Sequence, residues 1–308
     1  MGLRGKLFFI IITLIYSSCI NADGSRKFYF IDAHSQIDDK VSGVDVVLAR
    51  MNTNGVKTTL LSARGKRNWN NILQWSSEHP DMIAPLIRSK GKDYQNSTPK
   101  YYKKLRKQIE SGEFVGAAEA LIFHEKKGNK APKVAVELND KRVTVLLNES
   151  LRYGWPFVIH IEFASLHAQE RQQYMDDLTS LLEKHQEHPF ALIHMGQLQH
   201  QQVQELIEQH PNIYFLTSHT DPVTVNNSRQ PWINIFTPSG YHFKDSWKNL
   251  FNAYPDRFIF ALDNVWDYHW QNSYNKKMKY WREALLELPE NTAHLIAHGN
   301  AERLWKLK

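Results

Sequence analysis

Polar side chains that can bind a metal ion or move a proton follow several short apolar runs of this 308-residue chain. Such runs end at His34, Glu119, His160, His194 and Asp263. Imidazole and carboxylate groups ligate divalent metals and act as general acids and bases. Burying them without partners would cost on the order of several kcal/mol, which a shared metal ion or hydrogen-bond network would offset. The pattern therefore predicts that these side chains meet in one site.

The candidates differ in strength. One histidine at the end of an apolar strand is more often a satisfied core residue than a ligand, whereas His34, His160, His194 and Asp263 together favour a functional site. Glu119 could instead pair with a lysine. His219, which follows a further apolar run, fits either a binding residue or an ordinary loop residue.

The apolar runs themselves predict strands. They are rich in β-branched and aromatic residues and nearly continuous, as expected for strands buried on both faces of a parallel sheet. Their ranges are 28–33, 56–61, 83–88, 114–119, 157–161, 190–195, 212–217 and 258–263.

The segments between the strands have helical spacing. Val143, Leu146, Leu147 and Leu151, for example, form one apolar stripe that could cover a sheet. Alternating strands and helices predict the α/β class and a (β/α)8 TIM barrel, as one domain over 26–308. A doubly wound open sheet is the alternative, but no glycine-rich phosphate loop follows the first strand. Barrel active sites lie at the carboxyl ends of the strands, where the candidate residues stand.

Composition excludes several classes of protein. With 42% hydrophobic and 23% charged residues, the chain is neither disordered, collagen-like nor a coiled coil. A mean hydropathy of −0.51 and the lack of a second long apolar run exclude a polytopic membrane protein. The net charge of +6 is dispersed along the chain, which argues against nucleic-acid binding. We therefore expect a small-molecule substrate, no nucleic acid and no transmembrane span, and we leave a homo-oligomer open.

The first 22 residues predict a signal peptide. Arg4 and Lys6 precede the apolar run 7–16, and small residues follow, with cleavage expected after Ala22. The expected location is secreted or periplasmic. Lipoprotein anchoring through Cys19 is the alternative, although Tyr16 stands where such motifs usually have leucine.

Taken together, these residues resemble the amidohydrolase superfamily, specifically the amidohydrolase-related (amidohydrolase 2) group, which includes decarboxylases and lactonase-like hydrolases. The resemblance rests on the first-strand segment 31–36 with its His34-Ser35-Gln36, on His160, His194 and Asp263, and on the closing segment 299–304. It implies a divalent metal, usually Zn²⁺, held by a His-x-His pair, the fifth-strand histidine and the eighth-strand aspartate.

The chain departs from that pattern at Gln36, which replaces the second histidine. An amide oxygen is a weaker zinc ligand than imidazole. The resemblance leaves His34, His160 and Asp263 as metal ligands, with Gln36 as a weak or substituted ligand. Two histidines and one carboxylate with a water molecule remain a sufficient catalytic set.

The resemblance also implies roles for the catalytic residues. Asp263 would act as general base on a metal-activated water, and His194 would orient the substrate carbonyl. Glu119 would support a ligand or shuttle a proton. The implied activity is hydrolysis of an ester, lactone or amide. Decarboxylation by an enzyme of the same group and a degenerate barrel that binds a ligand without turnover are the alternatives.

Two sets of side chains bear on the substrate. The basic residues after the second and third strands favour an anionic substrate, with Arg64, Arg88 and His219 as binding residues, or else form a solvated loop. That basic set is Arg64, Lys66, Arg67, Arg88 and Lys90. Aromatic residues of the late loops could line a pocket or pack the outer helices. They are Trp232, Phe236, Tyr241, Trp266, Tyr268 and Trp270.

Overall fold

Strands and helices alternate along the chain in the computed structural model, which describes residues 28–127 and 132–307. All paired strands are parallel except β6, which pairs antiparallel with β5. The strands are β1 (Phe30–Ile37), β2 (Val56–Ala63), β3 (Ile83–Ile87), β4 (Gly116–Ala117), β5 (Ala120–His124), β6 (Val134–Ala135), β7 (Phe157–Ile161), β8 (Phe190–Leu192), β9 (Ile213–Leu216) and β10 (Phe258–Ile259).

Backbone hydrogen bonds close these strands into a barrel. The two sheets run β1-β2-β3-β4 and β10-β9-β8-β7-β5-β6. The first is joined to the second where Ala33 N donates to Phe260 O (3.0 Å) and Asp263 N to His34 O (2.8 Å). On the opposite side β4 and β5 follow one another in the chain. The predicted (β/α)8 barrel is thus confirmed.

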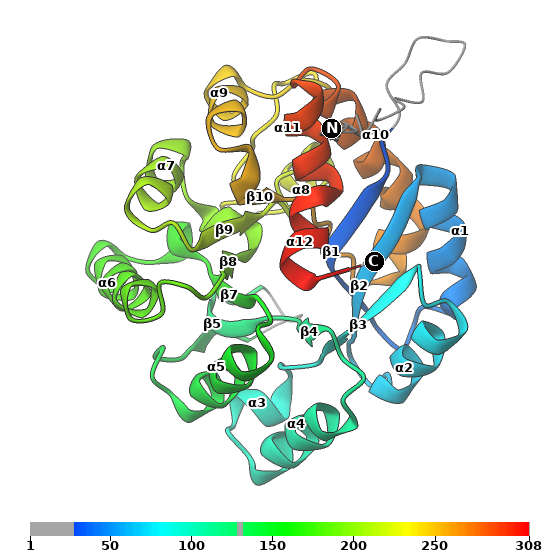
Figure 1. Cartoon of the computed structure of the whole chain (residues 1–308), viewed down its shortest axis with the longest axis vertical. Coiled ribbons are helices and arrows are strands. Elements are labelled where there is room, and N and C mark those ends of the chain that lie inside the picture. Colours follow the sequence, from blue (N-terminus) through cyan, green and yellow to red (C-terminus); the bar gives the residue numbers. More distant parts are fainter. Residues whose placement is uncertain (1–27, 128–131, 308) are drawn as a thin grey trace, which may run out of the picture.

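A ring of helices surrounds the strands (Figure 1). The longer helices bury apolar residues of one face against the strands. In α5, Val143, Leu146 and Leu147 are the buried face that the spacing predicted. The helices are α1 (Val44–Asn54), α2 (Trp69–Glu78), α3 (Lys92–Gln95), α4 (Pro99–Ser111), α5 (Lys141–Tyr153), α6 (Ala168–Lys184), α7 (His200–Gln209), α8 (Pro222–Asn227), α9 (Asp245–Ala253), α10 (Tyr274–Leu285), α11 (Glu290–His294) and α12 (Asn300–Trp305).

The amino ends of the strands form the floor of the barrel, which α12 covers (Figure 1). Leu304 and Trp305 pack with the small apolar side chains that fill the barrel interior. A Cβ at Gly116 would lie 3.0 Å from Trp305 Nε1 and 3.2 Å from Leu86. A side chain there would force Trp305 and Leu86 to shift slightly, so the close approach favours glycine.

Several predicted strands differ from the observed ones in extent. The run 28–33 corresponds to β1 at Phe30–Ile37, and in the run 258–263 the strand ends at Ile259. Two further differences have a clear physical cause. The run 114–119 was expected as one strand, but the barrel wall continues past Glu119 into β5. The break is held by Ser89, whose hydroxyl donates to Glu119 O and accepts from Glu119 N. The run 190–195 was also expected as a strand, but β8 ends at Leu192 because the chain then enters a left-handed turn.

None of the helices in the described ranges is long and apolar enough to cross a membrane. The expected signal peptide, residues 1–22, and Cys19 lie outside the described residues.

Candidate active site

A cavity of about 420 Å³ opens at the carboxyl ends of the strands, at the mouth of the barrel. Its wall takes side chains from nearly every strand end or following loop, including Gln36, Arg64, Arg88, Lys90, His124, Lys127, His160, His194, His219, Asp263 and Trp266. A larger hollow of about 1220 Å³ lies on the outer surface between α4 and α5, and no histidine lines it. The mouth of the barrel, where the histidines and Asp263 gather, is therefore the candidate active site.

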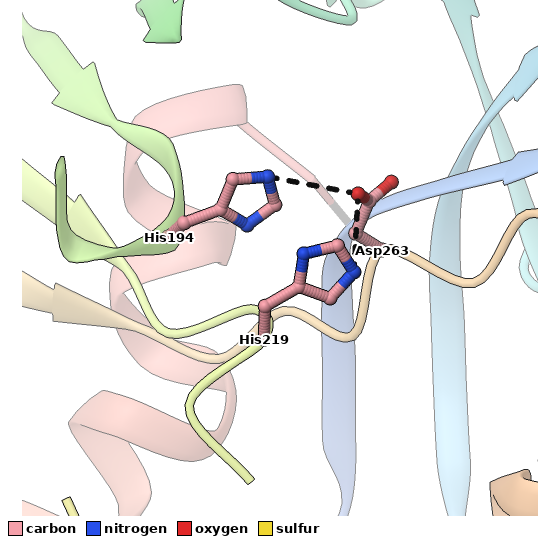
Figure 2. A group of neighbouring side chains, drawn as sticks. All are labelled: His194, His219 and Asp263. Atoms are coloured by element: carbon pink, nitrogen blue, oxygen red, sulfur yellow. Dashed lines mark ion pairs between the residues drawn. The ribbon is translucent and has the colours of Figure 1, made fainter. Parts of the chain in front are cut away.

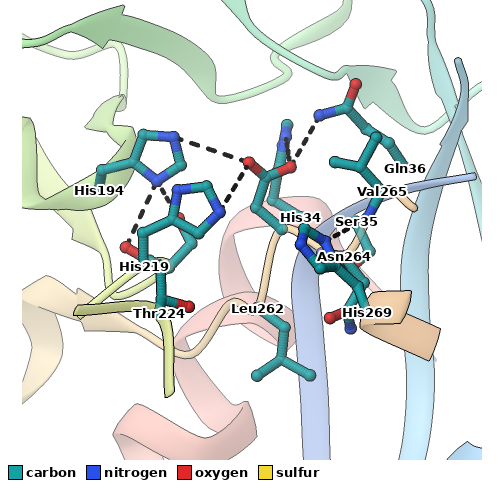
Figure 3. Close-up of polar contacts among 12 residues, drawn as sticks. His34, Ser35, Gln36, His194, His219, Thr224, Leu262, Asn264, Val265 and His269 are labelled. Atoms are coloured by element: carbon teal, nitrogen blue, oxygen red, sulfur yellow. Dashed lines mark hydrogen bonds and ion pairs between the residues drawn. The ribbon is translucent and has the colours of Figure 1, made fainter. Parts of the chain in front are cut away.

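Asp263 faces His194 and His219 in the mouth (Figure 2). Figure 3 shows the polar side chains gathered there, with His34 and Gln36 on the side away from His194. Asp263 Oδ1 accepts a hydrogen bond from Gln36 Nε2 (2.7 Å) and lies 3.5 Å from His34 Nε2. Its Oδ2 lies 3.7 Å from His194 Nε2 and 3.5 Å from His219 Nε2. Burial alone would raise the pKa of Asp263, but the hydrogen-bonding contact from His34 and the surrounding charges, Lys90 among them, hold it well below its usual range. Asp263 is therefore an ionised carboxylate facing three imidazoles.

The backbone is left-handed at all three members of the group in Figure 2. The φ angles are 57° at His194, 61° at His219 and 47° at Asp263. Residues 194–197 form a whole turn with positive φ. Each non-glycine residue in this conformation costs roughly 1–2 kcal/mol, and such strain persists mainly at functional sites. The turns aim three polar side chains at one point.

The first strand is fastened to the Asp263 loop by buried polar contacts. Ser35 Oγ donates to Asp32 Oδ2 (2.5 Å), and Asp32 Oδ1 accepts from Leu262 N (2.9 Å). Asn264 N donates to Ser35 Oγ (3.0 Å). Burial raises the pKa of Asp32 to about 6 against the effect of these bonds. Because the backbone N–H groups of Leu262 and Asn264 are both held, the backbone of Asp263 between them is fixed.

Four imidazoles from successive parts of the wall form an arc across the mouth. The ring centroids are 5.4 Å apart for His124 and His160, 4.9 Å for His160 and His194, and 4.3 Å for His194 and His219. Burial lowers the pKa of all four, to about 3 for His124 and far below the usual value for His194 and His219. Neutral imidazoles such as His194 and His219 keep one lone pair for a metal ion or a hydrogen-bond donor.

His160 is held between two glutamates. Its Nδ1 lies 2.7 Å from Glu119 Oε2 and its Nε2 lies 3.2 Å from Glu162 Oε1. Lys90 pairs with Glu119, and Lys127 Nζ lies 2.6 Å from Glu162 Oε1. Glu119 thus has the lysine partner that the sequence left open, and both nitrogens of His160 are engaged.

The donor set in the mouth fits a divalent metal. Ligand atoms of His194, His219 and Asp263 lie within 4.8 Å of one another, the one such group found in the described residues. Two imidazoles and a carboxylate suit zinc or another divalent ion. In the set that the sequence predicted, His34 and Asp263 are also in contact, and the buried His34 ring lacks a well-formed hydrogen bond to described residues. His160 differs, since its nitrogens face the two glutamates.

The residues proposed for substrate binding divide into two groups. Arg64, Arg88, Lys90 and His219 line the cavity, whereas Lys66 is exposed and Arg67 lies over Trp75. Among the aromatic residues, Trp266 lines the cavity and Trp232 lies 5.0 and 4.7 Å from the His194 and His219 rings. Phe236 and Trp270 belong to the core, and Tyr241 and Tyr268 are exposed.

Among the residues of the mouth that sequence reasoning missed are His124, Lys127 and Glu162. His124 closes the apolar run 120–123, the same signal that marked His160. Glu162 stands two residues after His160, so strand alternation could have placed both on one face. Lys127 lies in a loop and carries no such signal.

Comparison with known proteins agrees with this architecture. An uncharacterised TIM-barrel protein from Bordetella bronchiseptica is 12% identical with a TM-score of 0.60, covering 91% of this chain and 99% of that one. An amidohydrolase from Burkholderia multivorans, crystallised with bound zinc, is 12% identical with a TM-score of 0.53, covering 91% and 100%. Dihydroorotase from Campylobacter jejuni is 10% identical with a TM-score of 0.54, covering 91% and 84%.

Sequence comparison identifies the family. No curated protein sequence matches the chain. A family model described as Amidohydrolase matches residues 37–307, beginning directly after Gln36. Because this match spans most of the chain, the protein belongs to the amidohydrolase family.

Proposed function

We propose that this protein is a hydrolase of small molecules, with Asp263 as the general base. One observation carries the proposal: a buried, ionised carboxylate faces His34, His194 and His219, and no lysine or arginine of the described ranges forms an ion pair with it. A carboxylate without a lysine or arginine partner can accept the proton of an attacking water. In the ligand set that the family resemblance implies, His194, whose Nδ1 is 2.8 Å from Ser218 Oγ, would hold the substrate carbonyl.

A divalent metal, with Zn²⁺ first, is part of this proposal. His194, His219 and Asp263 would hold it, and it would supply an acidic water and a polarised carbonyl. His34 and His160, which the family resemblance implies as ligands, form the alternative set with Asp263. Substitution tells the sets apart: His219→Ala should lower bound metal under the first, and His160→Ala under the second. Metal analysis of protein purified without a chelating tag measures both.

The reaction is tested with a panel of esters, lactones and amides. We expect turnover of at least one class by metal-loaded wild type and its loss after chelation. Decarboxylation, the second reaction of the group, is tested with aromatic and β-keto acids in the same experiment. If metal-loaded protein turned over none of these compounds, the proposal that it is an enzyme would be contradicted.

A ligand-binding barrel without turnover is the second candidate function. Two contacts favour it: Gln36 donates to Asp263, and His160 is clamped by Glu119 and Glu162. Both residues stand where the family resemblance implies metal ligands. Protein that stays metal-poor when metal is supplied in excess, yet binds a small molecule in the mouth, would establish this candidate.

We also propose that the chain is exported, as a secreted or periplasmic protein or as a lipoprotein anchored at Cys19. The support is the order of charged, apolar and small residues in 1–22. Mass spectrometry of the mature protein should find an amino terminus close to Asp23, or a lipid-modified Cys19. An intact Met1 would contradict export.

A further inference from the structure

Two arginines in the mouth lack an acidic partner. Arg64 follows β2, and its guanidinium lies 5.6 Å from the centre of the Trp266 ring. Arg88 follows β3 and donates from Nη1 to Gly65 O (2.8 Å) and from Nε to Lys90 O (3.3 Å). Neither makes an ion pair within the described ranges. Lys90 and Lys127, by contrast, pair with buried glutamates.

The unpaired charge of the cavity wall is therefore mainly positive. With Lys90 and Lys127 paired to glutamates, Arg64, Arg88 and Lys92 remain as lining cations, and Asp263 is the carboxylate among the lining residues described. Burial lowers the pKa of Arg64, although Asp263 and Asp38 act against it. Burial and then the charge of Arg64 lower the pKa of Arg88, although Asp93 and Asp39 act against it. A bound anion would relieve the repulsion that Arg64 exerts on Arg88.

Arg64 lies close to the loop of Asp263, the proposed base, so an anion bound by Arg64 would lie near that base. Arg64 N donates to Ile37 O (2.9 Å), and Gln36 N donates to Asn264 O (2.6 Å). The end of β2, the end of β1 and the Asp263 loop are thus neighbours on the rim. Trp266, on which Arg64 lies, is three residues beyond Asp263. A small molecule held by Arg64 would reach Asp263 within the same cavity of about 420 Å³.

Arg88 keeps this arrangement in place. The Gly65 carbonyl that it binds belongs to the turn directly after Arg64, and Gly65 itself has φ of 60°. That positive φ is the reason for glycine at this turn, and a Cβ there would also collide with Asp39 Oδ1. Arg88 therefore contributes positive charge and also fixes the backbone that presents Arg64.

We infer that the ligand of this cavity is a small organic carboxylate, bound by Arg64 on the face of Trp266 with Arg88 beside it, while its reacting carbonyl faces Asp263. A guanidinium offers a carboxylate two parallel hydrogen bonds, which a lysine cannot do. Only the orientation of the reacting carbonyl rests on the proposed hydrolase function. The carboxylate site itself does not.

Calorimetric titration tests the site directly. The probes are the linear dicarboxylates from malonate to adipate, each compared with its neutral diamide and with inorganic phosphate. At least one dicarboxylate should bind about 10- to 100-fold more tightly than its diamide and than phosphate. Equal binding of acid and diamide, tighter binding of phosphate, or no binding of any dicarboxylate would overturn the inference.

Variants locate the site within the mouth. Arg64→Gln should weaken dicarboxylate binding about 10- to 100-fold, and Arg64→Lys, which keeps the charge, should recover only part of it. Lys66→Gln is the matched control, because it removes one charge two residues away on the exposed side of the loop. Equal losses in Arg64→Gln and Lys66→Gln would show a diffuse charge effect and contradict a built site. Circular dichroism and thermal unfolding verify the fold, and Arg64→Lys serves if Arg64→Gln does not fold.

Asp263→Asn separates this inference from the proposed function. It removes the carboxylate of the cavity wall, so dicarboxylate affinity should hold or rise while hydrolysis is lost. Arg64-dependent binding without hydrolysis by wild type would leave the inference standing and reject the hydrolase. If neutral esters were hydrolysed as fast as esters that bear a carboxylate, the hydrolase would stand and the carboxylate site would be rejected.

Discussion

The two ends of the barrel carry the same kinds of polar side chain in opposite circumstances. On the floor, Glu302 accepts from Tyr29 OH (2.6 Å) and lies 3.1 Å from His298 Nδ1, while the Tyr29 and His298 rings stack 4.0 Å apart. In the mouth, His34 is completely buried and both its ring nitrogens lack a well-formed hydrogen bond to described residues.

The difference separates two uses of a histidine beside a carboxylate. The floor contacts are partly open to water and mutually satisfied, so they fasten the start of β1 to α12. The mouth contacts are buried and incompletely satisfied, which costs free energy unless a ligand completes them. Strained φ angles at His194, His219 and Asp263 add to that cost. The polar contacts of the mouth thus lower the stability of the unliganded protein, whereas those of the floor raise it. This is the difference expected between a binding site and a structural contact.

The strongest way to break this comparison is Asp263→Asn. We expect kcat/KM for the best ester, lactone or amide to fall about 10²- to 10⁴-fold, because the proton acceptor is lost while the shape is kept. Glu302→Gln, at the floor, should leave kcat/KM unchanged. Steady-state kinetics of both variants decides, and an active Asp263→Asn enzyme would remove Asp263 as the base.

Gln36→His sharpens the description of the mouth. Imidazole is a stronger donor than the amide, and Gln36 Nε2 already lies 2.7 Å from Asp263 Oδ1, so zinc affinity should rise about 10- to 100-fold. Chelator competition measures the change. Gln95→His, which adds a histidine elsewhere on the cavity wall, is the matched control. No gain over Gln95→His would mean that Gln36 serves to hold Asp263 rather than as a weakened ligand.

Acid should destabilise the mouth through His124. Its pKa is about 3 in the folded protein because of burial, against an ordinary value of 6.5. Below pH 6.5 the unfolded chain takes up a proton that the folded protein refuses, so the free energy of unfolding falls as pH falls. Between pH 6.5 and 5 this amounts to roughly 1–2 kcal/mol. Urea unfolding of chelated protein should show a shallower pH dependence in His124→Gln; identical slopes would contradict the assignment.

The smallest effect is expected at the floor. Glu302→Gln should lower the free energy of unfolding by no more than about 1 kcal/mol, since the contacts of Glu302 are partly exposed. Thermal unfolding of the variant measures it. A loss several times larger would show that the floor, too, depends on a finely balanced polar cluster, and the contrast with the mouth would fail.

The barrel could be predicted from sequence because its strands are continuous apolar runs with a polar residue at the end. The rule that a polar residue marks the end of a strand failed where a polar residue lies in the middle of the barrel wall. Glu119 looked like the end of the fourth strand, but Lys90 and His160 satisfy its carboxylate, so the wall continues to His124. Such partners come from distant strands and leave no local signal.

The cluster in the mouth was predicted in part for the same reason. His34, His160, His194 and Asp263 were expected to share one site, and the structure places them together. That His194 and His219 stack at 4.3 Å and face one carboxylate oxygen could not be foreseen. It depends on left-handed backbone at histidine and aspartate, which packing imposes against local preference.

Both ends of the described chain lie at the floor of the barrel, which determines how the protein would be oriented on a surface or beside a fusion partner. Tyr29, near the start of the described chain, and Glu302, near its end, are hydrogen-bonded to each other beneath the barrel. A tether at either end, whether a lipid, a resin or a fusion partner, would therefore hold the molecule by its base. The mouth would face away from the attachment and stay open to solutes.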